Sequence, residues 1–188
     1  MSILKVSNIL APDELELIKT EIEKNEIEAD ETLGRKYMGP IHHVFTPELE
    51  DKMYAIARQA TDLPLTLKHA MVVEYSSEFG TPNLPPHFDG DINDLIINMQ
   101  LEANTSWDIG LNTETYTVED NSAVVFNGNA EAHWRPYKKF EEGEYVRMMF
   151  VRFYNEENPS DYSHLSQHWP SHDIFKEVRE FRDSLGTA

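Results

Sequence analysis

The second half of the chain is divided into many short apolar segments, and this pattern limits the fold more than any other feature of the sequence. The segments are rich in β-branched and aromatic residues, and Asn, Asp, Gly and Thr separate them. The predicted strands are residues 71–75, 95–101, 107–111, 115–118, 123–126 and 145–154. Many short strands with such punctuation indicate a sandwich, a barrel or a jelly roll, and not a parallel α/β sheet.

Amphipathic patterns at both ends of the chain predict helices around this β-rich part. Residues 12–25 form the first predicted helix, and the second begins at Pro47 with Thr46 as its cap. A third helix is predicted in the tail, where Ser171 is a suitable cap for a run with apolar residues at helical spacing. Residues 25–39 are polar and interrupted by glycine, so we expect a loop there.

The length and composition fit one folded domain. The chain has 188 residues, of which 40% are apolar and 11% aromatic, enough for one sizeable core. We expect a single domain over residues 1–188, with residues 1–66 as helical N-terminal support. Residues 67–156 would form the β core that carries the metal site, and residues 157–188 a C-terminal extension and helix.

Charge and residue usage exclude several classes of function. The net charge of −18 disfavours duplex nucleic acid and anionic membrane surfaces as partners. There is no cysteine, so disulfides, zinc fingers and cysteine nucleophiles are excluded. No apolar run approaches the roughly 20 residues that span a bilayer, and the first residues lack the features of a signal peptide. We therefore expect a soluble protein of the cytoplasm.

One short motif carries the chemistry that we expect of this chain. His87 and Asp89 are separated by one residue, and on extended backbone their side chains point to the same side. They follow a proline-rich loop, and His133 comes just after a predicted strand. Two histidines and one carboxylate can cover one face of a metal and leave the other open, as in non-haem Fe(II) oxygenases.

An arginine follows at a distance that suits an organic acid bound beside the metal. Arg147 lies fourteen positions after His133 within an apolar run, where a guanidinium can bind a carboxylate with two hydrogen bonds. Arg152 is the other candidate for this role, but it is five positions after Arg147, so on a strand its side chain would point to the opposite face. Arg147 is therefore the predicted carboxylate ligand.

Taken together, His87-x-Asp89, His133 and Arg147 resemble the motif set of the Fe(II)/2-oxoglutarate-dependent dioxygenases. The resemblance is strongest to the prolyl-4-hydroxylase-like branch, which includes small oxygenases encoded by bacteriophages. It covers roughly residues 71–154. It implies an α+β, mainly β fold: a double-stranded β-helix (jelly roll) core with iron at one open end, flanked by N-terminal helices and a C-terminal helix.

The resemblance also implies a role for each motif residue. His87, Asp89 and His133 would bind the iron, and Arg147 would bind the distal carboxylate of 2-oxoglutarate. Relatives often have Ser or Thr two positions after the arginine, where this chain has Met149, so another donor must serve. The presence of Asp89 disfavours halogenation, because halogenating relatives replace this carboxylate by a small residue.

Further residues are candidates for the co-substrate and substrate sites. The resemblance places Tyr75, Gln100 and Asn98 beside 2-oxoglutarate; a core aromatic and two solvent-facing residues of a half-buried strand are the alternatives. Trp134 and Arg135 are candidates for substrate contact at the pocket mouth, although Arg135 could equally pair with the acidic surface. His164, His168 and His172 have helical spacing, but Pro170 interrupts it, so we expect surface or packing roles.

The predicted function is that of an enzyme using Fe(II), 2-oxoglutarate and O₂, with ascorbate as a candidate stimulant. It would hydroxylate a substrate C–H bond while 2-oxoglutarate is decarboxylated to succinate. A peptidyl proline and a small molecule are comparable substrates, and the acidic surface favours a neutral or cationic one. If the gene is a phage gene, the enzyme would act in the host cytoplasm. The alternative is a non-catalytic jelly-roll binding or structural protein with a vestigial metal site; a cupin-type metalloenzyme would present H-x-H where Asp89 stands.

Overall fold

The computed structural model describes residues 3–24, 28–30, 34–82, 84–89 and 93–155. The helix predicted from Ser171 and the histidines at 164, 168 and 172 lie outside the described residues. No helix among the described residues is both long enough and apolar enough to cross a membrane.

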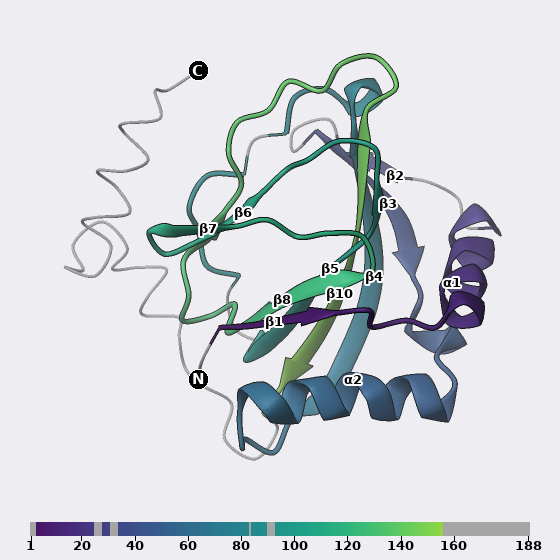
Figure 1. The fold of residues 1–188 in the computed structure, drawn as a ribbon, viewed down its shortest axis with the longest axis vertical. Coiled ribbons are helices and arrows are strands. Elements are labelled where there is room, and N and C mark those ends of the chain that lie inside the picture. The colour runs from purple at the N-terminus through teal and green to yellow at the C-terminus, as the bar shows by residue number, and fades with distance from the viewer. Residues whose placement is uncertain (1–2, 25–27, 31–33, 83, 90–92, 156–188) are drawn as a thin grey trace.

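Two antiparallel sheets form the centre of the molecule (Figure 1). The larger sheet has the order β1-β8-β5-β10-β4-β3-β2, and the smaller one has the order β7-β6-β9. The strands of the larger sheet are β1 (Leu4–Ser7), β2 (Glu28–Asp30), β3 (Arg35–Pro40), β4 (Thr66–Ser76), β5 (Leu95–Ala103), β8 (Ser122–Phe126) and β10 (Tyr145–Tyr154). Those of the smaller sheet are β6 (Ile109–Leu111), β7 (Glu114–Tyr116) and β9 (His133–Trp134).

The chain alternates between the two sheets as a jelly roll requires. After β4 in the larger sheet it passes to His87, which forms an isolated antiparallel bridge with His133 at the edge of the smaller sheet. It then returns for β5, crosses for β6 and β7, returns for β8, crosses for β9 and returns for β10, the last strand of the described residues. The predicted fold class, a jelly-roll core with flanking N-terminal helices, is confirmed.

Helices α1 (Pro12–Lys24) and α2 (Pro47–Ala60) cover the outer face of the larger sheet. Thr46 caps α2 by accepting a hydrogen bond from the backbone NH of Leu49, and Pro47 occupies the first turn, as predicted. Short 3₁₀ turns at His42–Val44 and Ser77–Phe79 connect neighbouring elements. The apolar stripes of both helices pack on alternate residues of the central strands, such as Val72, Ile97 and Val151.

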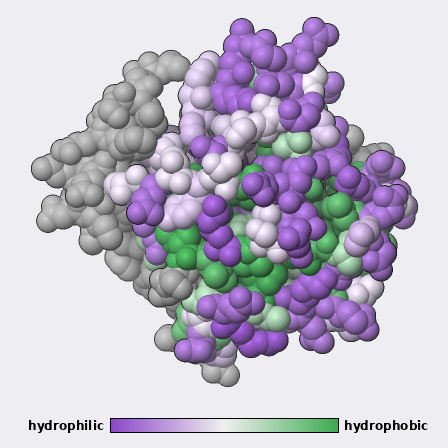
Figure 2. Space-filling model, in the orientation of Figure 1, coloured by the Kyte–Doolittle hydropathy of each residue, from purple (hydrophilic) through white to green (hydrophobic). Residues whose placement is uncertain are grey.

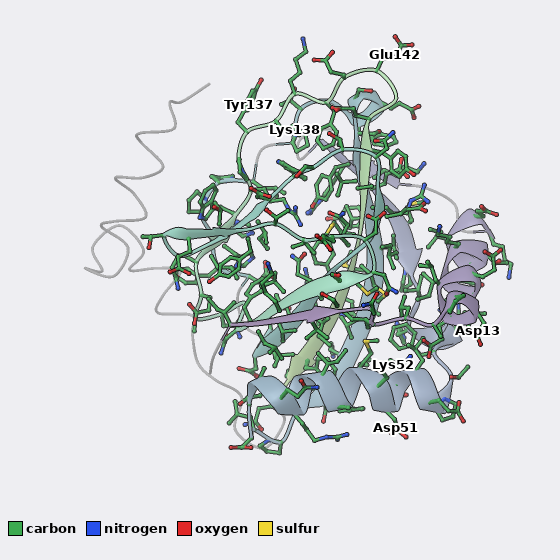
Figure 3. All side chains as sticks on the ribbon, viewed as in Figure 1. Asp13, Asp51, Lys52, Tyr137, Lys138 and Glu142 are labelled. Carbon is green, nitrogen blue, oxygen red and sulfur yellow. The ribbon has the colours of Figure 1, made fainter. Side chains whose placement is uncertain are left out.

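Charged side chains occupy the outer surface of these helices. Lys52 of α2 pairs with Glu14 of α1 and so links the two helices. Figure 3 shows Lys52 and Asp51 on α2 and Asp13 at the start of α1. In the same orientation, Figure 2 shows a band of apolar side chains across the middle of the face toward the viewer, above the position of α2, with polar regions above and below the band. The polar surface agrees with the acidic composition.

The inner face of the larger sheet looks toward the smaller sheet and carries the other set of alternate residues. Val73 of β4, Asn98 of β5 and Phe150 of β10 all lie on this inner side, where they line a pocket between the sheets. Because successive side chains of a strand point to opposite faces, a residue one position away faces the helices instead. Whether a residue holds an odd or an even position along its strand, which we call its parity, therefore decides whether its side chain can reach the pocket.

The segment predicted as a loop, residues 25–39, contains two strands, and this expectation was wrong. β3 pairs with β4, with Lys36 opposite Glu74 and Tyr37 opposite Val73, and β2 pairs with β3. The N-terminal third is thus not only helical support, because it also supplies strands to the larger sheet. Polar composition hid these strands, because β2 forms the edge of the sheet and β3 lies next to it, between β2 and β4.

Candidate metal centre and adjoining pocket

Backbone pairing holds the predicted ligand residues together. The NH of His87 donates to the carbonyl of His133 at 3.0 Å, and the NH of His133 donates to that of His87 at 2.9 Å. The NH of Asp89 donates to the carbonyl of Gly128 at 2.9 Å. These bonds cross between segments far apart in the sequence, so the site is fixed by the jelly-roll pairing itself.

Three ligand atoms converge at this place. One nitrogen of His87, one of His133 and one carboxylate oxygen of Asp89 all lie within 4.8 Å of one another. The Oδ1 atom of Asp89 is 3.2 Å from Nε2 of His133 and 3.7 Å from Nε2 of His87. The structure thus brings together the three residues predicted as ligands, in a geometry that a single metal ion could bridge.

The second nitrogen of each imidazole ring is held by the backbone. Nδ1 of His87 lies 2.7 Å from the carbonyl oxygen of Pro85, and Nδ1 of His133 lies 3.1 Å from that of Glu131. A carbonyl oxygen can only accept, so Nδ1 carries the proton in both rings. Nε2 of each ring then faces the centre, where that of His133 lies within hydrogen-bond distance of Asp89. A bound metal would replace this contact, and the outer hydrogen bonds orient both rings as in metal-bound histidines.

The charges at the centre also favour a cation. Burial, followed by the proximity of His133, lowers the pKa of His87 to about 4, so this ring is neutral at pH 7 and keeps its lone pair. Burial opposes the ionisation of Asp89, but the hydrogen bond with His133 and the nearby positive groups outweigh it and lower its pKa to about 2. The centre therefore offers neutral nitrogen and ionised oxygen, the donor set that suits Fe(II).

A pocket of about 270 Å³ opens beside the three ligand residues. Its volume is near the lower end of the range for small-molecule sites, about 300–1,000 Å³. The walls come from both sheets and from the segment that holds Leu84, His87 and Asp89. The lining includes the apolar residues Met71, Val73, Leu84, Ile96, Ile109, Phe126 and Phe150. Polar groups converge on it as well, which is the usual composition of a ligand pocket.

Arg135 lies deep in this pocket, and not at its mouth as predicted. Its side chain is 7% exposed, its Nη1 donates to the carbonyl of Trp107 at 2.7 Å, and its guanidinium lies 4.8 Å from the centre of the Trp107 ring. Nη2 approaches Oδ1 of Asn98 at 3.4 Å and the sulfur of Met148 at 3.5 Å. Among the described residues no carboxylate forms an ion pair with it.

Arg135 therefore brings an uncompensated charge into the pocket. Burial lowers its pKa to about 10, against the opposing effects of Tyr75 and Asp108, so the guanidinium is still charged at neutral pH. A buried charge without a partner is costly, and a bound anion would remove that cost. Such a cation is the natural partner for the distal carboxylate of a bound organic acid.

The segment between β9 and β10 packs on Trp107, next to Arg135. The ring of Phe140 lies 5.4 Å from that of Trp107, and Nε1 of Trp107 donates to the carbonyl of Pro136 at 2.7 Å. Figure 3 shows Tyr137 and Lys138 projecting outward from the same segment. The segment thus covers Trp107, which in turn covers the guanidinium of Arg135.

Arg147 does not line the pocket, so its position does not support the predicted role as carboxylate ligand. Its Nε and Nη2 atoms donate to Glu74 at 3.0 and 2.6 Å, and its Nη1 pairs with Glu102. Glu102 also pairs with Lys19 of α1. Arg147 has the parity of Met149, which packs under the helices, so its side chain points away from the metal centre.

Of the three other residues predicted to contact the co-substrate, two line the pocket and one does not. Tyr75 and Asn98 line the pocket, and Tyr75 is 1% exposed, with a pKa raised by burial against the opposing charges of Arg35 and Arg135. Gln100 shares the face of Asn98 but does not line the pocket, since its amide donates to Asp120 at 2.9 Å. The expectation for Gln100 is therefore not supported by its position.

Trp134 also lines the pocket, although it is nearly inaccessible to solvent. It is 2% exposed, its Nε1 donates to the carbonyl of Asn112 at 3.2 Å, and its ring lies over Gly110. A Cβ atom at Gly110 would approach that ring to 1.9 Å. These contacts favour a wall residue over a substrate contact at the pocket mouth.

Two arginines of the pocket, Arg35 and Arg152, were not among the site residues predicted from the sequence. Arg35 lies in the segment expected to be a loop, and only the pairing of β3 with β4 brings it to the pocket. Arg152 was rejected because of its parity, but that parity is the one that faces inward. Its Nη2 lies 3.8 Å from Oδ2 of Asp89.

No protein-family model and no curated protein sequence matches the chain. Solved structures do. HygX from Streptomyces hygroscopicus, crystallised with nickel and 2-oxoglutarate, superposes with a TM-score of 0.61 at 13% identity, over 82% of this chain and 83% of HygX. The chain has the fold of the Fe(II)/2-oxoglutarate oxygenases.

Two prolyl hydroxylases share this fold with the chain. The Pseudomonas putida prolyl-4-hydroxylase superposes with a TM-score of 0.58 at 13% identity, over 82% of this chain and 92% of the hydroxylase. The viral collagen prolyl hydroxylase of Paramecium Bursaria Chlorella virus-1 gives 0.52 at 14% identity, over 81% and 96%. The similarity to the prolyl-hydroxylase-like branch that the sequence motifs predicted thus extends to the fold.

Proposed function

We propose that this protein is an Fe(II)/2-oxoglutarate-dependent oxygenase. The observation that carries the proposal is the convergence of His87, Asp89 and His133 at the wall of a pocket whose deep end holds an unpaired guanidinium. A metal ion and a dicarboxylate would satisfy both features at once. The shared fold of oxygenases crystallised with a metal and 2-oxoglutarate supports this assignment.

In this proposal each residue of the centre has a defined task. His87 and His133 would bind Fe(II) through Nε2, and Asp89 through its carboxylate. When bound, iron and 2-oxoglutarate activate O₂ for the oxidation of a substrate C–H bond, and 2-oxoglutarate leaves as succinate and CO₂. The carbonyls of Pro85 and Glu131 keep both rings in the orientation that metal binding needs.

Arg135 would bind the distal carboxylate of 2-oxoglutarate in place of Arg147. Its guanidinium is buried, charged and lacks an ion-pair partner among the described residues, whereas Arg147 is already neutralised by two glutamates. Because the hydrogen bond to the Trp107 carbonyl fixes Nη1, the guanidinium is held before the ligand arrives. Asn98 and Tyr75 would complete the polar wall around the carboxylate.

The proposal extends to the kind of substrate that the enzyme oxidises. A C–H bond of a small molecule or of a peptide, such as peptidyl proline, would be hydroxylated. HygX has been crystallised with hygromycin B, and a prolyl hydroxylase of Trichoplax adhaerens with a peptide fragment, so the shared fold accommodates both kinds of ligand. The competing function is a jelly-roll binding protein that holds a metal without turnover.

Anaerobic titration of the metal-free protein with Fe(II) and then 2-oxoglutarate tests the proposal. We expect the visible charge-transfer band that 2-oxoglutarate chelated to Fe(II) produces. The band should be absent in His133→Ala and present in His43→Ala, a matched loss of an exposed histidine. A folded protein that gives no band would refute the oxygenase assignment. A band without 2-oxoglutarate decarboxylation, with or without added substrate, would favour the binding protein.

A further inference from the structure

The pocket carries more positive charge than iron and 2-oxoglutarate require. Among its lining residues Arg35, Arg135 and Arg152 each contribute one positive charge, while Asp89 contributes the one negative charge. The two positive charges of Fe(II) and the two negative charges of 2-oxoglutarate cancel. The loaded pocket therefore keeps a surplus of about two positive charges.

Arg152 contributes the positive charge that lies beside the proposed metal ligand Asp89. It is on the inner face of β10, its side chain is 26% exposed, and its Nη2 lies 3.8 Å from Oδ2 of Asp89. That separation is too long for a hydrogen bond. Its Nε is buried and has no hydrogen-bond partner. Arg152 thus lines the pocket with a guanidinium whose hydrogen-bond capacity is not fully used.

Metal binding would leave Arg152 with even less compensation. Asp89 is the only carboxylate paired with it among the described residues, and a metal ion would withdraw the charge of that carboxylate. The guanidinium would then be half-buried, charged and without a full partner. A planar, bidentate donor of this kind matches a carboxylate or phosphate better than any neutral group.

We propose that the substrate of this oxygenase carries an anionic group, a carboxylate or a phosphate, which binds to Arg152 beside the metal. The inference rests on the proposed function and narrows its substrate. It places the anion on the metal side of the pocket, whereas Arg135 serves the co-substrate at the deep end. Arg35, which also lines the pocket, adds to the attraction.

The acidic surface does not prevent this. The net charge of −18 is spread over the whole molecule, and salt screens such charges beyond about 8–10 Å at physiological ionic strength. Inside the pocket the nearby guanidiniums set the potential, because buried charges are screened much less. The neutral or cationic substrate expected from composition is therefore disfavoured by the local charge.

Sulfate, an inert anion, is the probe for the test. The protein is loaded anaerobically with Fe(II) and saturating 2-oxoglutarate, so that Arg135 is occupied, and sulfate is added while heat and the visible band are recorded. Arg152→Met removes the proposed anchor, and Arg58→Met removes an exposed arginine of α2 as the matched control. We expect Arg152→Met to weaken sulfate binding at least tenfold and Arg58→Met to change it less than twofold.

A purely structural role of Arg152 would give a different result. If it only positions Asp89, Arg152→Met would weaken Fe(II) binding in the metal titration, and sulfate binding would fall in parallel with it. That outcome, no sulfate binding by the loaded wild type, or equal sulfate affinity in the two variants would overturn the proposal. Failure to form the Fe(II)/2-oxoglutarate band would instead refute the oxygenase assignment and the inference with it.

Competition then separates the two anion chemistries. Acetate and methyl phosphate are titrated against sulfate on the loaded wild type. The stronger competitor identifies the group that the substrate carries, and the loss of its effect in Arg152→Met confirms the site. If neither compound competes, the sulfate is bound elsewhere and the proposal is wrong.

Discussion

The assignment of Arg135 as the anchor of 2-oxoglutarate leads to a sharp prediction. Arg135→Met keeps an unbranched apolar side chain at this position but removes the guanidinium. A bidentate pair contributes two hydrogen bonds to charged groups, each worth about 1.5–3 kcal/mol. Allowing for the desolvation of the free guanidinium, about 3–4 kcal/mol would be lost. The Kd for 2-oxoglutarate should therefore rise about 100–1,000-fold.

The fold should tolerate this change. The carbonyl of Trp107 loses a 2.7 Å hydrogen bond, at a cost of about 1–3 kcal/mol, but an unpaired buried charge is removed at the same time. Fe(II) binding depends on other side chains and should change less than threefold in Kd. Arg135→Lys keeps the positive charge but loses the planar guanidinium that can bind a carboxylate with two hydrogen bonds. We therefore expect an intermediate rise in the Kd for 2-oxoglutarate, of about tenfold.

Calorimetric titration of 2-oxoglutarate into the Fe(II)-loaded protein measures the effect directly. Arg147→Lys is the control, because its ion pairs with Glu74 and Glu102 lie outside the pocket and the charge is kept. We expect its Kd to stay within twofold of the wild type. The reasoning would be refuted if Arg147→Lys lost 2-oxoglutarate binding while Arg135→Met retained it.

Three further outcomes follow from the described contacts. His133→Ala should reduce Fe(II) affinity at least 100-fold in an anaerobic metal titration, because it removes one of three ligands; an unchanged affinity would contradict the centre. Gly110→Ala should lower the free energy of unfolding by about 2–4 kcal/mol in urea denaturation, since its Cβ would approach the Trp134 ring to 1.9 Å; a fully stable variant would show that this ring can move. In the metal-free protein the pKa of His87 is about 4 when folded, against an ordinary value of 6.5, so the unfolded state takes up its proton first. Stability should therefore fall as the pH drops from about 6.5 toward 4, and His87→Gln should show a weaker fall in its urea midpoint; equal slopes would contradict the shift.

Local spacing and strand pattern were enough to predict that His87, Asp89 and His133 lie together. His87 and Asp89 are two positions apart, so extended backbone alone puts them on one side, and the following strands predict a jelly roll that can return a second histidine. β10 covers residues 145–154, as its apolar run indicated. These features depend on residues close in sequence or on the repeated strand pattern, which is why they could be read without a structure.

The choice between the arginines could not be made from the sequence. Both faces of β10 are apolar, because one packs under the helices and the other faces the pocket, so alternation does not reveal which parity points inward. The register also shifts between Arg147 and Met148. Only the placement of the helices shows that Arg152 faces the site and Arg147 does not.

β9 links the two halves of the proposed site. His133 begins β9 and Arg135 directly follows it, two positions along the chain, and both side chains line the pocket. The proposed metal ligand and the proposed carboxylate anchor are thus carried by neighbouring residues. Residues 84–89 hold both: His87 exchanges two backbone hydrogen bonds with His133, and Leu84 accepts one from the NH of Arg135 at 2.9 Å. The proposed metal and co-substrate sites therefore share one hydrogen-bonded pair of segments, and a shift in either segment would displace both together.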